Sequence, residues 1–250
     1  AGLTFVTGLR AILRHDPDVM MVGEVRDLET AGIAIRCALT GHLVFSTLHT
    51  NDAASGITRL IDIGVEPYLV ASSVEALIAQ RLVRVICSSC KEEDRSIPME
   101  EIKRQIAKEL GLAPTQKNFT IYHGKGCHEC DFTGFLGRLA IFEILLMNEA
   151  IKQMIMKRAT AGNIAQAAIK QGMGARRQDG WEKVVAGLTT PGEILGATQG
   201  VEAPAFGAEI DGIFSLAIKP PDASPMESKF ANPDERRLFR RFDARVNVYY

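Results

Sequence analysis

Long apolar runs and a strong net charge are both missing from this sequence of 250 residues. No apolar run approaches the roughly 20 residues that a membrane-spanning helix needs, and no secretory signal is visible. The formal net charge of −1 argues against a nucleic-acid-binding field over the whole molecule, but it does not exclude a local basic patch. A starting methionine is also missing, because the chain begins Ala-Gly-Leu, and we expect a fragment or a processed product.

Apolar residues make up 46% of the sequence, which is enough for a sizeable core in one large or two smaller domains. Helical and strand patterns alternate at first. The predicted elements, in chain order, are a helix over 4–15, a strand over 19–22, a helix over 30–41, a strand over 43–48, a helix from Asn51 or Asp52 to Gly64, and a helix over 67–82. The first strand is a continuous apolar run, as expected of a parallel strand covered on two faces, and the second is also predicted to be buried. This order predicts an α/β fold with a doubly wound parallel sheet.

The remainder of the chain has a different pattern. It predicts a charged helix over 98–111, a strand over 138–147, and small helices over 148–158, 163–172 and 179–187. A last helix opens with a capping box, in which Thr190 is the N-cap, Pro191 the first helical residue and Glu193 the third. Residues rich in Pro, Gly, Ala and Ser then indicate a linker. We predict five parts: 1–86, 87–146, 147–198, the linker 199–228, and 229–250.

Polar side chains follow both apolar strands at the point where each strand ends. Glu24 comes just after the first strand and His49 just after the second. Ligands of parallel α/β sheets bind at the carboxyl ends of the strands, so neighbouring strands would bring Glu24 and His49 to one crevice. An acid in this place can serve Mg²⁺ or an attacking water, although a Glu after a strand is more often a turn residue or a helix cap. A lone His at a strand end is likewise more often a structural hydrogen-bonding group.

A second histidine, His42, stands at the entrance of the second strand. It is seven residues from His49, so the two side chains point to opposite faces of an ideal strand. The entrance is the wrong end of a strand for chemistry. On spacing alone, His42 is therefore predicted to be structural.

Residues 16–35, which contain Gly-Glu-x-Arg-Asp, together with residues 38–67, closely resemble the ATPases of type II secretion and type IV pilus assembly. The first block resembles their Walker B region and the second their His box. The resemblance covers roughly residues 1–198. It implies a partial RecA-like parallel sheet with flanking helices, a zinc-binding subdomain and a small helical C-terminal region. It further implies that Glu24 is the catalytic Walker B glutamate and that His49 lies near the γ-phosphate of ATP.

The same resemblance implies further properties of the site and its surroundings. Arg26, Asp27 and His42 belong to the matching motifs and are expected to contribute to binding of ATP and Mg²⁺. The family forms homo-hexamers in the cytoplasm and docks on a polytopic platform protein of the inner membrane, with no nucleic acid involved. Its P-loop, G-x-x-x-x-G-K-[ST], which holds the phosphates, occurs nowhere in this sequence. We therefore expect the C-terminal portion of a motor subunit that is inactive alone.

Four of the five cysteines form two C-x-x-C pairs, Cys87 with Cys90 and Cys127 with Cys130. Each pair can present two thiolates at about 2.3 Å from a metal, and two pairs complete a tetrahedron. The pattern predicts a structural Zn²⁺ site, and the alternatives are reduced free thiols or a redox pair. Such pairs make the chain more similar to the extension and secretion ATPases than to the retraction ATPases. The fifth, Cys37, is predicted to be a small core residue.

The charged end of the chain carries the stretch ERRLFRRF over residues 235–242. Charge runs are usually solvated. The stretch also resembles the R-x-x-x-R entry of PilZ domains, which bind cyclic di-GMP, and Arg236 and Arg240 have the required spacing, as do Arg237 and Arg241. Guanidinium groups suit this ligand because they bind phosphate oxygens and stack on guanine.

Two interpretations follow. In the first, the chain belongs to a motor that couples ATP hydrolysis to assembly of a pilus or pseudopilus. In the second, it is a zinc-stapled interaction module, responsive to cyclic di-GMP, that never hydrolyses ATP. A nucleic-acid-binding zinc ribbon is a weaker alternative, because the charge is balanced and no aromatic-basic platform is present.

Overall fold

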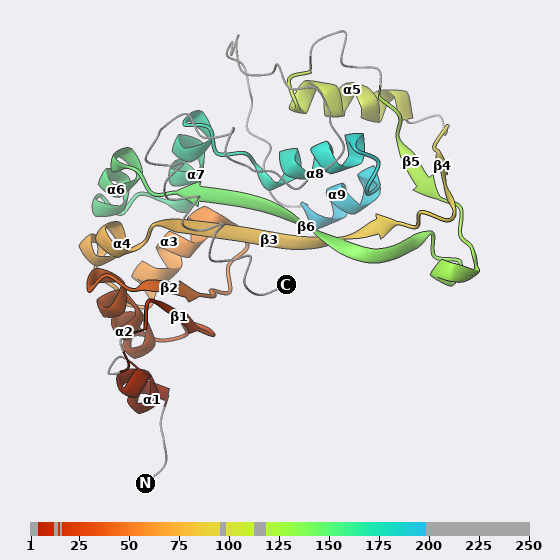
Figure 1. The fold of residues 1–250 in the computed structure, drawn as a ribbon. Coiled ribbons are helices and arrows are strands. Elements are labelled where there is room, and N and C mark those ends of the chain that lie inside the picture. Colours follow the sequence, from red (N-terminus) through yellow and green to blue (C-terminus); the bar gives the residue numbers. More distant parts are fainter. Residues whose placement is uncertain (1–4, 13–14, 16, 96–98, 113–118, 199–250) are drawn as a thin grey trace. The chain divides into compact units, whose positions relative to one another are not determined.

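The computed structural model describes residues 5–12, 15, 17–95, 99–112 and 119–198 (Figure 1). The predicted linker, and the PilZ-like segment with Arg236 and Arg240, lie outside these residues. None of the helices in the described ranges is both long and apolar enough to span a lipid bilayer.

A parallel pair of strands forms the first part of the fold, as predicted. Strand β1 (Val19–Val22) pairs with β2 (Leu43–Ser46), and helix α2 (Leu28–Leu39) connects them, since a parallel pair requires a crossover. Helix α1 (Phe5–Ile12) precedes β1. The prediction that β1 is covered on two faces is wrong for the described residues. Its even-numbered side chains are buried, whereas Met21 is 73% exposed.

The longest strands form an antiparallel ribbon, which we call the β3–β6 ribbon (Figure 1). Strand β3 (Ala76–Ile86) pairs with β6 (Phe135–Leu146), with an irregularity between Arg84 and Ile86. The strand predicted over 138–147 is thus confirmed.

The single helix predicted over 67–82 is wrong. Helix α4 (Pro67–Ser73) ends after seven residues, and β3 follows it. The apolar spacing misleads here, because Ala79 and Val83 are four residues apart and such residues share a face in a helix and in a strand. Pairing with β6 decides between the two conformations.

The segment between β3 and β6 contains a short hairpin and a helix. Strands β4 (Lys91–Glu93) and β5 (Tyr122–Gly124) pair antiparallel, and the 3₁₀ helix η3 (His128–Cys130) follows β5. Helix α5 (Met99–Glu109) confirms the predicted charged helix.

The remaining helices pack around the ribbon. They are α3 (Ala53–Asp62), α6 (Glu149–Met156), α7 (Ala161–Lys170), α8 (Arg176–Val185) and α9 (Pro191–Ala197). Half of the predicted capping box forms in α9, because the Thr190 hydroxyl accepts the Glu193 N–H at 3.4 Å. The Glu193 carboxylate instead accepts hydrogen bonds from Arg84 of β3.

Two apolar clusters form the core, and the β3–β6 ribbon contributes to both. One cluster includes Ile57 of α3, Val70 of α4 and Leu145 of β6. The other surrounds Trp181 of α8, whose indole N–H donates to Glu109 Oε2 at 2.6 Å, and it includes Ile141 of β6. The ribbon therefore links the part of the fold near β1 and β2 to the helices that follow β6.

Candidate functional site

Two hydrogen bonds join the loops that follow β1 and β2. The Val25 N–H donates to the Thr47 carbonyl at 3.1 Å, and the Thr47 hydroxyl donates to the Gly23 carbonyl at 2.6 Å. The parallel pairing of β1 and β2 is thus extended beyond the last paired residues, Val22 and Ser46. As a result, residues 24 and 49 are carried to the same edge.

Glu24 and His49 meet at this edge. His49 Nε2 lies 2.5 Å from Glu24 Oε1, and Arg26 Nε donates to Glu24 Oε2 at 2.5 Å. The Glu24 side chain is 20% exposed, whereas those of His49 and Arg26 are 83% and 77% exposed. Arg26 donates to one carboxylate oxygen, whereas the other, which His49 approaches, has no hydrogen-bond partner among the described residues. Such a carboxylate can accept from a water molecule or from the hydration shell of a metal ion.

An open pocket of about 280 Å³ lies over this contact. Its lining residues are Glu24, Val25, Arg26, His49 and Arg59. Arg59 was not predicted as a site residue; it is exposed on α3, two turns after the N-cap Asp52. An isolated arginine on a helix surface has no distinctive spacing, so only the fold identifies it as part of the pocket. It adds a second guanidinium to a site that is expected to receive phosphate oxygens.

Asp27 has a structural contact in the described fold. Its Oδ1 accepts the Thr30 N–H at 2.8 Å, so it is the N-cap of α2. Hydrogen bonds from the Thr30 backbone and side chain lower the pKa of this carboxyl. Its contribution to cofactor binding stays a prediction.

His42 lies at the entrance of β2, at the end opposite to His49. Its Nδ1 is 3.0 Å from the Cys37 carbonyl and 3.0 Å from the Thr40 hydroxyl, both at the C-terminal end of α2. The same carbonyl also accepts from the backbone N–H groups of Thr40 and His42, so the ring adds to a set of hydrogen bonds that closes the end of α2. His42 is therefore not brought together with Glu24 and His49, and its nucleotide-binding role also stays a prediction.

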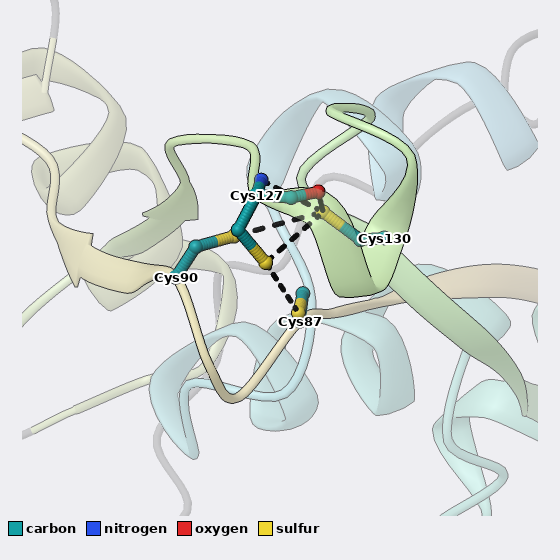
Figure 2. A group of neighbouring side chains, drawn as sticks. All are labelled: Cys87, Cys90, Cys127 and Cys130. Atoms are coloured by element: carbon teal, nitrogen blue, oxygen red, sulfur yellow. Dashed lines mark hydrogen bonds between the residues drawn. The ribbon is translucent and has the colours of Figure 1, made fainter.

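The four predicted metal ligands converge on one point (Figure 2). The sulfurs of Cys87, Cys90, Cys127 and Cys130 all lie within 4.8 Å of one another. Three of the S···S distances are 3.8 Å. Ligands at about 2.3 Å from a tetrahedral Zn²⁺ are separated by ~3.8 Å, so the spacing fits a Cys₄ zinc site. None of these cysteines forms a disulfide.

Backbone N–H groups point at two of the sulfurs. Cys130 Sγ accepts from Cys127 N at 3.2 Å and from Gly134 N at 3.3 Å, and Cys90 Sγ accepts from Gly126 N at 3.3 Å. The Cys127 N–H and then the Gly134 N–H act against burial and lower the pKa of Cys130 to about 6. These donors favour the thiolate, which is the form that binds a metal, at Cys130, whereas burial outweighs the Gly126 N–H and raises the pKa of Cys90 to about 12.

The backbone of the two cysteine loops is closely packed. Gly134 has a φ of +78°, and a Cβ at this position would lie 2.4 Å from the Gly124 carbonyl oxygen. A glycine is therefore required here for both its conformation and its size. The same residue donates to Cys130 Sγ, so the close approach also positions a ligand.

Comparison with known proteins identifies the family of the chain. The family model described as "Type II/IV secretion system protein" matches residues 1–202. The type IV pilus assembly ATPase PilB of Myxococcus xanthus is 42% identical over 198 residues, which are 79% of this chain and 34% of the relative. The type II secretion system protein E of Pectobacterium carotovorum is 46% identical over 199 residues, which are 79% of this chain and 38% of the relative.

Solved structures show a related fold. The pilus retraction motor PilT with bound ADP has a TM-score of 0.52 and 28% sequence identity, over 78% of this chain and 44% of that chain. The ATPase DotB of Yersinia pseudotuberculosis has a TM-score of 0.51 at 18% identity, over 78% of this chain and 40% of that chain, which supports the fold alone. The chain thus spans less than half the length of these relatives. It belongs to the family of type II/IV secretion system proteins.

Proposed function

We propose that this chain is the C-terminal portion of a cytoplasmic motor ATPase that drives assembly of a type IV pilus or of a type II secretion pseudopilus. The observation that carries the proposal is the contact between Glu24 and His49 at the carboxyl edge of a parallel strand pair. It is supported by curated relatives named as pilus assembly ATPases and type II secretion proteins.

Glu24 is proposed to hold the attacking water, or the hydration shell of Mg²⁺, through one carboxylate oxygen. Arg26 and His49 contact this carboxylate from two sides and restrict its rotation. His49 is also proposed to hydrogen-bond the terminal phosphate, and Arg59, which lines the same pocket, to balance its charge. ATP and Mg²⁺ would supply the phosphoanhydride and the neutralising cation, and the side chains orient the reacting groups.

A phosphate-binding loop is not among these 250 residues, so the proposal requires that other sequence supply it. By analogy with the family, the working form is a homo-hexamer that docks on a platform protein of the inner membrane. The Cys₄ site is proposed to hold a structural Zn²⁺, because four thiolates leave no open position for water.

The decisive experiment uses a full-length protein that carries this sequence. Glu24→Gln keeps the size of the side chain and removes its charge, so phosphate release should fall by about 10²–10⁴-fold while ATP still binds. Glu149→Gln is a suitable control, because Glu149 is an exposed residue in the first turn of α6, outside the pocket. Near-normal hydrolysis by Glu24→Gln would overturn the assignment of Glu24, whereas absence of hydrolysis by the unsubstituted full-length protein would favour the non-enzymatic module.

A further inference from the structure

The loop that carries His49 is fixed at both ends. At its start, the Thr47 hydroxyl donates a hydrogen bond to the Gly23 carbonyl in the loop after β1. At its far end, Arg176 Nη1 of α8 donates to the Asn51 carbonyl at 2.9 Å. Arg81 Nη2 of β3 lies 3.3 Å from Asn51 Oδ1 as a further donor. His49 therefore lies on a short segment between two anchored points.

A third contact fixes the start of the helix that follows this loop. The Ala53 N–H donates to Glu143 Oε1 of β6 at 2.9 Å. Ala53 is the first residue of α3, and the Asp52 side chain caps Ser55 instead, so Glu143 satisfies a different one of the free N–H groups at the helix start. The partial positive charge of a helix N-terminus also favours a carboxylate there.

Glu143 and Arg176 are buried charged residues, with exposures of 5% and 3%. Burial of such groups is costly unless they are paired or hydrogen-bonded. Glu143 accepts a hydrogen bond from the backbone of residue 53, which lies 90 residues away along the chain. Arg176 donates one to the backbone of residue 51, which lies 125 residues away. Apolar side chains would fill the same space without this cost, so packing alone does not account for them.

We propose that Glu143 and Arg176, assisted by Arg81, are positioning residues that hold the loop of His49 and thereby set its approach to Glu24. They touch neither the pocket nor Glu24, and they act through the backbone of residues 51–53. Only the expected effect of these residues on ATP hydrolysis rests on the proposed function; their effect on the loop does not. It links the nucleotide site to β3, β6 and α8.

The first test is independent of ATP. Hydrogen exchange is measured in the full-length protein for the amides of Ala53 and Val25, which donate to Glu143 and Thr47. Glu143→Leu should speed exchange at both amides by at least about tenfold, whereas Glu143→Gln, which keeps an acceptor oxygen, should have a much smaller effect. Glu149→Leu makes the same change at an exposed site and should leave both amides protected. Unchanged exchange rates of both amides in Glu143→Leu would overturn the inference, whether or not the protein hydrolyses ATP.

The second test is kinetic. Glu143→Leu should lower kcat by about ten- to hundredfold and leave KM for ATP within about threefold, because small displacements of a positioned group mainly affect the chemical step. The loss should disappear in a His49→Ala background, since the two residues act through one contact. Losses that multiply in the double variant would contradict the proposal. If Glu143→Leu fails to fold, Arg81→Met tests the same loop from an exposed residue, with a smaller but equally non-additive loss expected.

Discussion

Arg84 of β3 and Glu193 of α9 form a forked ion pair that fastens the last described helix to the β3–β6 ribbon. Glu193 Oε1 accepts from Arg84 Nη2 at 2.7 Å and from Nε at 3.1 Å, and Glu193 Oε2 accepts from the Arg84 backbone N–H at 2.9 Å. The Thr189 hydroxyl adds a hydrogen bond to the Arg84 carbonyl at 2.7 Å. One arginine of the ribbon thus organises the start of α9.

This pair predicts a pH-dependent contribution to stability. Arg84 lowers the pKa of Glu193, so the stabilisation is fully present above the pKa of an unfolded glutamate, about 4.3, and is lost as the pH falls through the lowered value. Glu193→Gln should reduce the free energy of unfolding by about 1 kcal/mol at pH 7, a modest amount because the Arg84 side chain is 55% exposed. Urea unfolding at pH 7 and at pH 3 measures the effect. A difference that does not shrink at the lower pH would contradict the assignment, and Glu149→Gln controls for the loss of a surface charge.

The two histidines should respond differently to substitution. His49→Ala is expected to lower ATP turnover more than ATP binding in a full-length protein, because the side chain contacts Glu24. His42→Ala should instead cost at most about 1 kcal/mol of stability, because it removes one of several donors to the Cys37 carbonyl at the end of α2. Melting temperatures and steady-state kinetics of both variants separate the roles. A turnover defect in a fully stable His42→Ala protein would support the nucleotide role implied by the family motif.

The 250-residue chain alone should show no appreciable ATPase activity. Glu24, His49 and Arg59 supply groups for one side of the nucleotide, but no G-x-x-x-x-G-K-[ST] loop is present to hold the β- and γ-phosphates. Phosphate release with Mg²⁺ checks this expectation. Turnover that disappears on Glu24→Gln would show that the missing loop is dispensable.

The cysteine cluster should carry one Zn²⁺ per chain. Elemental analysis of protein purified without added metal measures the content, and four freely titratable thiols in the native protein would contradict the site. Cys127→Ser should release the metal and lower stability, because metal-binding energy in such sites is largely folding energy. Cys37→Ser, at a buried cysteine outside the cluster, is the control that should keep the zinc.

Local chemistry was readable from the sequence where a residue acts on its neighbours. Thr190 caps its helix as predicted, because a cap is satisfied within three residues. The convergence of Glu24 and His49 was also predictable, since it follows from placing two parallel strands side by side. The four cysteines form two C-x-x-C pairs, a spacing that is typical of zinc sites.

Long-range pairing explains most of what the sequence did not reveal. Residues 76–82 have a spacing that suits a helix, and only β6, far along the chain, makes them a strand. Arg59, Glu143 and Arg176 lack a local signature as well, because their partners depend on how distant elements pack. The Glu193 carboxylate was expected to close its own helix cap, but a guanidinium from β3 competes for it.

The position of the cysteines also bears on the order of folding events. Cys87 directly follows the last residue of β3, and Cys130 precedes β6 by a few residues. Strands so far apart in sequence pair slowly, because the intervening chain must be closed against its entropy before any contact forms. A metal held by both cysteine pairs would close that segment first, and β3 and β6 would then pair from the metal end across a short connection. Zinc would then raise the folding rate as well as the equilibrium stability. Refolding without zinc should be slow even where the final structure is reached.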